Sequence, residues 1–223
     1  MKVSKGEIFE HVFINEPEVD LHIIQETGSR VKIHLINVQW DDVQCTKEFI
    51  NRVFIEQTGE GCQTEIYALA YLHGEENVLT ETHVKHAVGG GSSNQLIKFV
   101  LDDNSRGRFI GDLKIVKDAQ QTEAHQTNRN LLLSETAEMR TQPQLEIYAD
   151  DVKATHGAST GQLDESALFY MQQRGIGKQK ARQLLVNAFM KEVLDKVQSD
   201  NVQSTKDLEA LRALLNAIDG IVQ

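Results

Sequence analysis

Apolar and polar residues alternate with a period of two along much of the chain, from residue 8 to about residue 158. Alternation places one set of side chains in a core and the other in water, as a half-buried β-strand requires. The runs are rich in the β-branched and aromatic residues that favour strands. Examples are Ile8, Glu10, Val12 and Ile14, then Val31, Ile33 and Leu35, then Ile66, Ala68, Ala70 and Leu72. The pattern therefore predicts a long β region, residues 1–160.

Glycine-containing segments such as Thr27-Gly28-Ser29 and Gly89-Gly90-Gly91 separate the runs and predict tight turns. Asn128, Arg129 and Asn130 precede three leucines and predict another turn, in which asparagine side chains bond the backbone. Many short strands joined in this way are typical of a sandwich, a barrel or a β-solenoid. Because no repeat period is legible, the alternation alone does not choose among these architectures.

After Gly161 the pattern changes to that of helices. Asp164 predicts the N-cap of a helix that runs to about Arg174, and Gly175 suits the left-handed residue that ends it. A second helix is expected over residues 178–197. Its apolar stripe is formed by Ala181, Leu185, Phe189 and Val193, with Leu184 and Ala188 beside them.

A third helix is expected near the end of the chain. Ser204 and Asp207 form a capping-box pattern, and apolar residues follow at helical spacing: Leu208, Leu211, Leu215 and Ile218. The expected organisation is therefore a β core over residues 1–160 and a helical C-terminal segment over residues 161–223.

The composition and net charge of the chain exclude some classes of protein. The chain has 223 residues with 40% hydrophobic and 25% charged residues, which is ordinary for a globular protein. The net charge of -10 argues against a general binder of nucleic acid or anionic membranes, because phosphates repel an acidic surface. Neither a signal peptide nor a run of about 18 apolar residues is visible, and two cysteines are too few for a disulfide framework. These features predict a cytoplasmic protein.

The most specific segments lie within residues 105–176, and they read SRGRFIGDLKIVKDAQQTEAHQTNRNLLL, PQLEIYADDVKATHGASTGQLDE and ALFYMQQRGI. The chain resembles the SufB/SufD family of iron–sulfur cluster assembly scaffolds, and the SufD branch most closely. The resemblance implies an all-β core with a helical tail, namely a right-handed parallel β-helix followed by a short helical bundle. It also implies a non-catalytic scaffold. Family members usually carry a further N-terminal helical region, so the chain is expected to be a fragment of a longer protein.

The resemblance singles out His156, in the segment DVKATHGA. In this family the stretch lies where two related scaffold subunits meet. His156 is therefore expected to offer a ligand to a transient Fe–S cluster shared with a SufB-like partner, since a neutral imidazole nitrogen can bind iron. The family often has cysteine where this chain has Ala154, so no cluster is expected to be held stably by this chain alone.

The resemblance also implies that the helical tail docks SufC, an ABC-type ATPase. The residues expected at this contact are Leu168, Phe169, Arg174, Leu184 and Leu185. An unpaired edge strand near residues 143–158 would pair with the SufB-like subunit and could also form a homodimer of the isolated fragment.

Two other functions compete with the scaffold. The segment Gly175-Ile176-Gly177, followed by Ala181, resembles a helix-hairpin-helix nucleic-acid motif, and the residues around it are basic. A carbohydrate-active enzyme is the second alternative, because β-helices often carry polysaccharide chemistry. It would require clustered carboxylates, or an arginine–lysine pair, on one face of the solenoid.

The remaining candidates have structural interpretations. Cys45 and Cys62 lack companion cysteines and are expected to be buried, because a complete Fe–S site normally needs four thiolates or histidine substitutes. His83 and His86 would face opposite sides of a strand, so they are not expected to form a ligand pair. His125 is expected to belong to a polar network.

Overall fold

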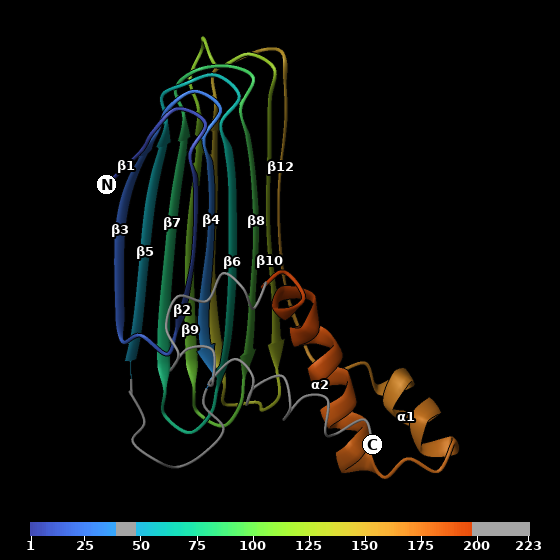
Figure 1. Ribbon diagram of the computed structural model, residues 1–223. Coiled ribbons are helices and arrows are strands. Elements are labelled where there is room, and N and C mark those ends of the chain that lie inside the picture. Colours follow the sequence, from blue (N-terminus) through green and yellow to red (C-terminus); the bar gives the residue numbers. More distant parts are fainter. Residues whose placement is uncertain (39–47, 198–223) are drawn as a thin grey trace.

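The computed structural model, which describes residues 1–38 and 48–197, is a parallel β-solenoid followed by two helices (Figure 1). The chain passes back and forth between two six-stranded sheets, because odd-numbered strands form one sheet and even-numbered strands the other. The first sheet, sheet A, has the order β1 (Lys2–Val3), β3 (Glu18–Gln25), β5 (Glu48–Gln57), β7 (Asn77–His86), β9 (Arg106–Ile115) and β11 (Glu138–Ile147). The second, sheet B, has the order β12 (Val152–Gly161), β10 (Thr122–Leu132), β8 (Ser92–Leu101), β6 (Gln63–Leu72), β4 (Arg30–Val38) and β2 (Ile8–Ile14).

Every neighbouring pair of strands is parallel and in register, so side chains stack in rows along the solenoid. Ile33, for example, pairs with Ile66, and both side chains point into the space between the sheets. The expected alternation is confirmed: the runs from Val31 to Leu35 and from Ile66 to Leu72 supply buried residues of the core. Burial of these apolar rows away from water is the main force that holds the two sheets together.

The interior also contains polar rows, which the alternation did not reveal. Asn128 and Asn130 lie inside β10, not in a turn, so the predicted turn at this position is wrong. Both are buried, and each donates a side-chain hydrogen bond to the other, at 3.0 and 2.8 Å. Mutual bonding replaces the water that these amides lose on burial, and therefore lets a strand carry asparagine into the core.

The two helices begin as the sequence predicts. In α1 (Glu165–Gln173), the carboxylate of Asp164 accepts a hydrogen bond from the backbone N–H of Ser166 at 2.8 Å. Gly175 follows the helix with φ +83°, a left-handed conformation that glycine adopts without steric cost. The second helix, α2 (Lys178–Leu194), ends three residues earlier than expected. The expected third helix and Cys45 lie outside the described residues.

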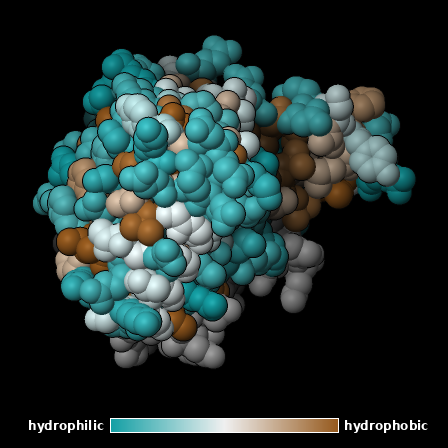
Figure 2. Space-filling view, turned by 90° about the horizontal axis from the view of Figure 1, so that it is seen from above, coloured by the Kyte–Doolittle hydropathy of each residue, from teal (hydrophilic) through white to brown (hydrophobic). Residues whose placement is uncertain are grey.

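Helix α2 packs on the outer face of sheet B, near the ends of β6 and β8 (Figure 1). Its buried side chains Val186, Met190, Val193 and Leu194 meet outward-facing residues of the sheet, among them Leu69 and Val100. Apolar residues gather where the helical segment meets the solenoid, whereas the rest of the face in Figure 2 is largely hydrophilic.

The contact face of α2 is rotated from the predicted stripe. Ala181 and Val193 are buried as expected, but Leu184 and Leu185 are half-buried and Ala188 is exposed. Spacing along a helix shows that an apolar stripe exists. The tilt at which the helix meets the sheet decides which neighbouring residues take the central contact.

Candidate functional site

The solenoid ends in two edge strands, β11 and β12, each of which pairs on one side only within the described residues. We call this end, formed by β11 and β12, the open end. On β12, Lys153 and residues 155–161 are exposed, and Val152 and Ala154 are half-buried. An edge strand of this kind presents unpaired backbone N–H and C=O groups, which can pair with a strand of another chain.

His156 lies on β12 and is exposed. It is in register with Gln126 of β10, so both side chains belong to the row that faces the interior of the solenoid. The preceding residue, Thr155, belongs to the outward-facing row, where its hydroxyl lies 2.8 Å from Nδ1 of His125. His156 therefore belongs to the inward-facing row at the open end of the solenoid. His125 belongs to an exposed polar pair, as predicted.

The interior beneath His156 is polar. The side-chain amide of Gln126 donates to Oε1 of Gln95 at 3.4 Å, and both residues are buried. Gly111, on the facing sheet, makes room for this amide, because a Cβ at Gly111 would lie only 2.4 Å from Nε2 of Gln126. Sequence reasoning missed Gln126 and Gly111, since a glutamine in an alternating strand carries no sign of which side it faces.

No group of three or more His, Cys, Asp or Glu side chains is placed to hold a metal ion in residues 1–38 and 48–197. Cys62 is fully buried, and its thiol contacts the carbonyl oxygens of Glu26 and Gly59, both at 3.1 Å. This burial agrees with the structural role expected for Cys62.

The predicted docking residues of the tail fall into two groups. Phe169 is 63% exposed, and Arg174 is exposed beside Tyr170, whose hydroxyl accepts its hydrogen bond at 2.8 Å. Leu168 is only 2% exposed, so it supports α1 from within and has no free surface for a partner in this conformation. Tyr170, 58% exposed, was missed by the sequence analysis although it directly follows Phe169.

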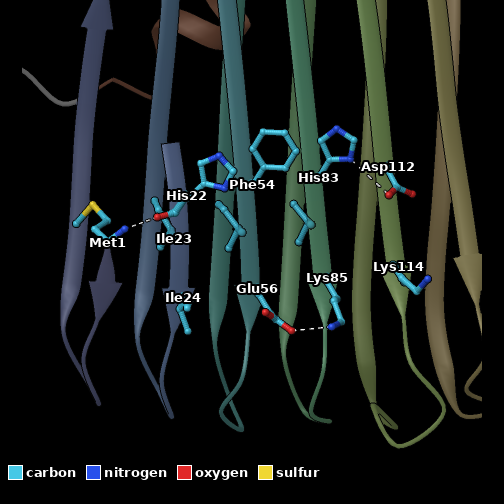
Figure 3. A pocket seen from close by; sticks show the side chains of 12 residues that line it. Met1, His22, Ile23, Ile24, Phe54, Glu56, His83, Lys85, Asp112 and Lys114 are labelled. Carbon is cyan, nitrogen blue, oxygen red and sulfur yellow. Dashed lines mark hydrogen bonds and ion pairs between the residues drawn. The ribbon is translucent and has the colours of Figure 1, made fainter. Parts of the chain in front are cut away.

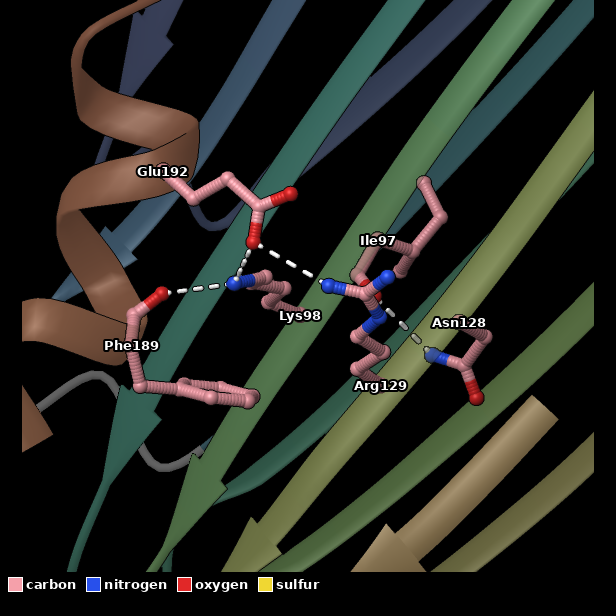
Figure 4. Close-up of polar contacts among 6 residues, drawn as sticks. All are labelled: Ile97, Lys98, Asn128, Arg129, Phe189 and Glu192. Atoms are coloured by element: carbon pink, nitrogen blue, oxygen red, sulfur yellow. Dashed lines mark hydrogen bonds and ion pairs between the residues drawn. The ribbon is translucent and has the colours of Figure 1, made fainter. Parts of the chain in front are cut away.

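The tail is attached to sheet B by a charged cluster (Figure 4). Lys98 of β8 is buried and donates to Glu192 and, at 2.8 Å, to the carbonyl oxygen of Phe189. Arg129 of β10 contacts the same oxygen of Glu192 at 3.3 Å. The hydrogen bond from Lys98 is the main cause that lowers the pKa of Glu192, against the opposing effect of its partial burial. A lysine within the apolar run from Leu96 to Leu101 was the available sequence signal for this cluster.

The outer face of sheet A carries a shallow groove of about 480 Å³ (Figure 3). The rings of His22, Phe54 and His83 stack along it with centroid distances of 4.5 and 4.6 Å. Nδ1 of His83 lies 3.5 Å from Asp112, whereas His86 is buried inside the solenoid. The two histidines therefore face opposite sides, as predicted, and His86 is structural.

Carboxylates on this face lie in rows beside basic residues. Glu56 pairs with Lys85 and Glu146 with Lys114, each at 2.7 Å. Arg52 lies between Glu18 and Glu81, at 3.6 and 3.1 Å. Carboxylates neutralised in this way do not form the acid and base pair that polysaccharide hydrolysis requires. The described face therefore gives no support to the carbohydrate-active alternative.

The helical hairpin places its basic residues partly against the protein. Arg182 donates to the carbonyl oxygen of Leu133 at 3.2 Å, and this bond attaches the start of α2 to the loop after β10. Because this contact engages the guanidinium of Arg182, that cation is less available to bind a phosphate of nucleic acid. None of the described helices is long and apolar enough to cross a membrane.

Comparison with known proteins covers the solenoid and most of the tail. The family described as "SUF system FeS cluster assembly, SufBD core domain" matches residues 8–189. The chain is 38% identical over 145 residues to the iron-sulfur cluster assembly protein SufD of Escherichia coli (strain K12), covering 65% of this chain and 34% of that protein. It is 39% identical over 149 residues to the SufBD family protein slr0076 of Synechocystis, covering 66% and 32%. The chloroplastic protein ABCI7 of Arabidopsis thaliana is 35% identical over 147 residues, covering 66% and 31%. The matched part thus spans about a third of each relative.

Proposed function

Because the chain belongs to the SufBD family of SUF-system iron–sulfur cluster assembly proteins, we propose that it acts as a non-catalytic scaffold subunit. Its open end pairs with a SufB-like subunit, and its helical tail docks a SufC-like ATPase. The observation that carries the proposal is the family match across residues 8–189. It is taken together with an edge strand that bears His156 and that pairs on one side only within the described residues.

The pairing with a SufB-like subunit is supported by the backbone of β12. This strand has ten residues and bonds β10 along its whole length, so its other side offers a straight row of hydrogen-bonding groups. Strand addition at such an edge gives affinity through the main chain, and side chains give specificity. The same surface lets two copies of the isolated chain associate when the natural partner is absent.

His156 is the cluster ligand that this chain offers. The nascent Fe–S cluster is the cargo of the assembly, and a complete site takes four thiolate or imidazole ligands. Since no such set is gathered in the described residues, the partner subunit supplies the remaining ligands. The cluster is therefore shared at the subunit contact and leaves when the two subunits separate.

The ATPase contact is formed by α1. Phe169, Tyr170 and Arg174 are exposed on this helix, and aromatic and arginine side chains dominate the binding energy of many protein interfaces. Leu184 and Leu185 of α2 are half-buried and are the other expected members of this contact. ATP is bound and hydrolysed by the partner, whose closure moves the docked helices. A cytoplasmic location is part of the proposal, because the free thiol of Cys62 suits a reducing compartment.

The test is co-purification of this chain with SufB-like and SufC-like proteins of the same host. Phe169→Asp should lose the ATPase and retain the SufB-like partner, and His156→Ala should retain both proteins and lose cluster formation on the complex. Arg108→Asp, on the exposed outer face of sheet A, is the matched control and should behave as the parent. If the parent retains neither protein, the proposed scaffold role is wrong for this part of the chain.

A further inference from the structure

A row of residues runs through the interior of sheet B and ends at His156. Ile66 of β6 pairs with Gln95 of β8, Gln95 pairs with Gln126 of β10, and Gln126 pairs with His156 of β12. In a parallel sheet, residues in register on adjacent strands point the same way, so their side chains are neighbours. His156 is therefore the next position of a ladder that is already polar at Gln95 and Gln126.

The hydrogen bonding of this ladder has a direction. Nε2 of Gln126 donates to Oε1 of Gln95, which points the amide nitrogen toward the inner side of the ladder. Oε1 of Gln126 is buried and has no hydrogen-bond partner. A buried carbonyl oxygen normally accepts a hydrogen bond, so we expect a donor to approach Oε1 of Gln126.

On the facing sheet, no described side chain donates a hydrogen bond to Oε1 of Gln126. Gly111 lies against the amide of Gln126 and has no side chain. Its register neighbour on β11 is Pro143, which has neither a polar side chain nor a backbone N–H. Its register neighbour on β7 is Thr82, whose buried hydroxyl makes no hydrogen bond to Gln126. Of the two neighbours of Gln126 in the row, Gln95 turns its oxygen toward Gln126, while its own amide nitrogen has no partner. His156 carries the side-chain N–H group on the side of the open end.

We propose that Gln126 is a positioning residue for His156. Its Oε1 accepts the N–H of one imidazole nitrogen when the ring turns over the open end. The other nitrogen then keeps its lone pair and points away from the interior, toward the subunit contact. A hydrogen bond to one ring nitrogen sets the tautomer and the orientation of a histidine ligand. The metal-directed half of this inference rests on the proposed function, whereas the hydrogen bond itself does not.

The direct test is the tautomer of His156 in the full chain, measured by two-bond proton–nitrogen NMR correlations on protein labelled at histidine. In the parent, the ratio of the two tautomers should differ by about tenfold from that of a free histidine, the scale of one net hydrogen bond. A parent whose ratio equals that of a free histidine would overturn the inference, and this measurement needs no variant.

Variants add specificity to the test. Gln126→Met keeps the length of the side chain and removes the acceptor, so the tautomer ratio of His156 should return to that of a free histidine. Gln126→Glu keeps an acceptor and should retain the ratio of the parent. Asn128→Leu is the matched control, because Asn128 is a buried polar residue of the same strand whose register partner is Ala158. His22, exposed on sheet A, should give an unchanged signal throughout. An unaltered ratio in Gln126→Met contradicts the inference.

Cluster assembly separates this inference from the proposed function. If Gln126→Met changes the tautomer while His156→Ala leaves cluster assembly intact, the positioning holds and the ligand role is wrong. If His156→Ala abolishes assembly while Gln126→Met leaves the tautomer unchanged, the scaffold role holds and the positioning is wrong.

Discussion

Lys98 and Glu192 are 94 residues apart in the sequence and form an ion pair between β8 and α2. The side chain of Lys98 is 2% exposed and that of Glu192 is 45% exposed. The ammonium of Lys98 also lies 4.2 Å from the centre of the Phe189 ring, so two side chains of α2 contact it. The pair therefore fixes where α2 rests on sheet B, and with it the position of the tail.

Removal of the anion alone should be costly. Glu192→Gln leaves the buried ammonium of Lys98 without its counter-charge, and we expect a loss of about 1–3 kcal/mol in the free energy of unfolding. This is below the usual 3–5 kcal/mol for a buried pair, because Glu192 is partly solvated. Urea denaturation measures the loss.

The double variant Lys98→Met/Glu192→Gln is the control for this ion pair. Methionine fills the same space without a charge, so most of the lost stability should return. Equal stability of the single and double variants would show that the buried charge is not the cause.

Acid should destabilise the solenoid through His86. Burial lowers the pKa of His86 to about 4, whereas the unfolded chain has a pKa near 6.5. Between these values the unfolded chain binds a proton and the folded chain does not, so stability falls as the pH drops from about 6.5 to about 4. The loss from this residue amounts to roughly 3 kcal/mol over that range.

The measurement for His86 is unfolding free energy as a function of pH. His86→Gln should show a shallower fall between pH 7 and pH 5 than the parent. His34 also has a pKa lowered to about 4, chiefly by burial, so part of the slope should remain. Ser159→Ala, a change of an exposed residue that carries no titratable group, should leave the slope unaltered, and an identical slope in all three proteins would contradict the assignment.

Gly111 should tolerate no side chain. In Gly111→Ala, the new Cβ would meet Nε2 of Gln126 at 2.4 Å and the tip of the Phe109 ring at 2.6 Å. We expect overpacking to cost about 1–3 kcal/mol, seen as a lower thermal midpoint. Gly157→Ala is the matched comparison, since no atom lies within 4 Å of the Cβ it would add. Equal thermal midpoints for the two variants would show that the side chains around Gly111 can shift to accept a Cβ.

The isolated chain should self-associate through β12. Sedimentation velocity should detect dimers that increase with protein concentration. Ala158→Lys places a charge on the exposed edge strand and should reduce them, because charged side chains protect edges from pairing. Gln142→Lys, on exposed β11, tests whether the whole open end takes part. Dimers that persist unchanged in Ala158→Lys would place the contact elsewhere.

The strands were predictable because burial on one side imposes a period of two, as in Ile66 to Leu72. The alternation did not distinguish a solenoid from a sandwich, because both bury alternate residues. The resemblance to a family supplied that distinction. The partners of Gln126 and Lys98 were not predictable, since they come from strands and helices distant in the sequence. The rotation of α2 from Leu185 to Val186 depends likewise on the shape of the sheet beneath it.

The regular row spacing has an evolutionary consequence. Gln95 and Gln126 are 31 residues apart, and the adjacent outward row from His125 to Thr155 is spaced by 30. In such repeats each coil of the solenoid contacts its neighbours, so duplication or deletion of a whole coil away from α2 preserves most of the remaining contacts. Descendants could therefore lengthen or shorten the solenoid and still present the same last coil, with His156 at its edge.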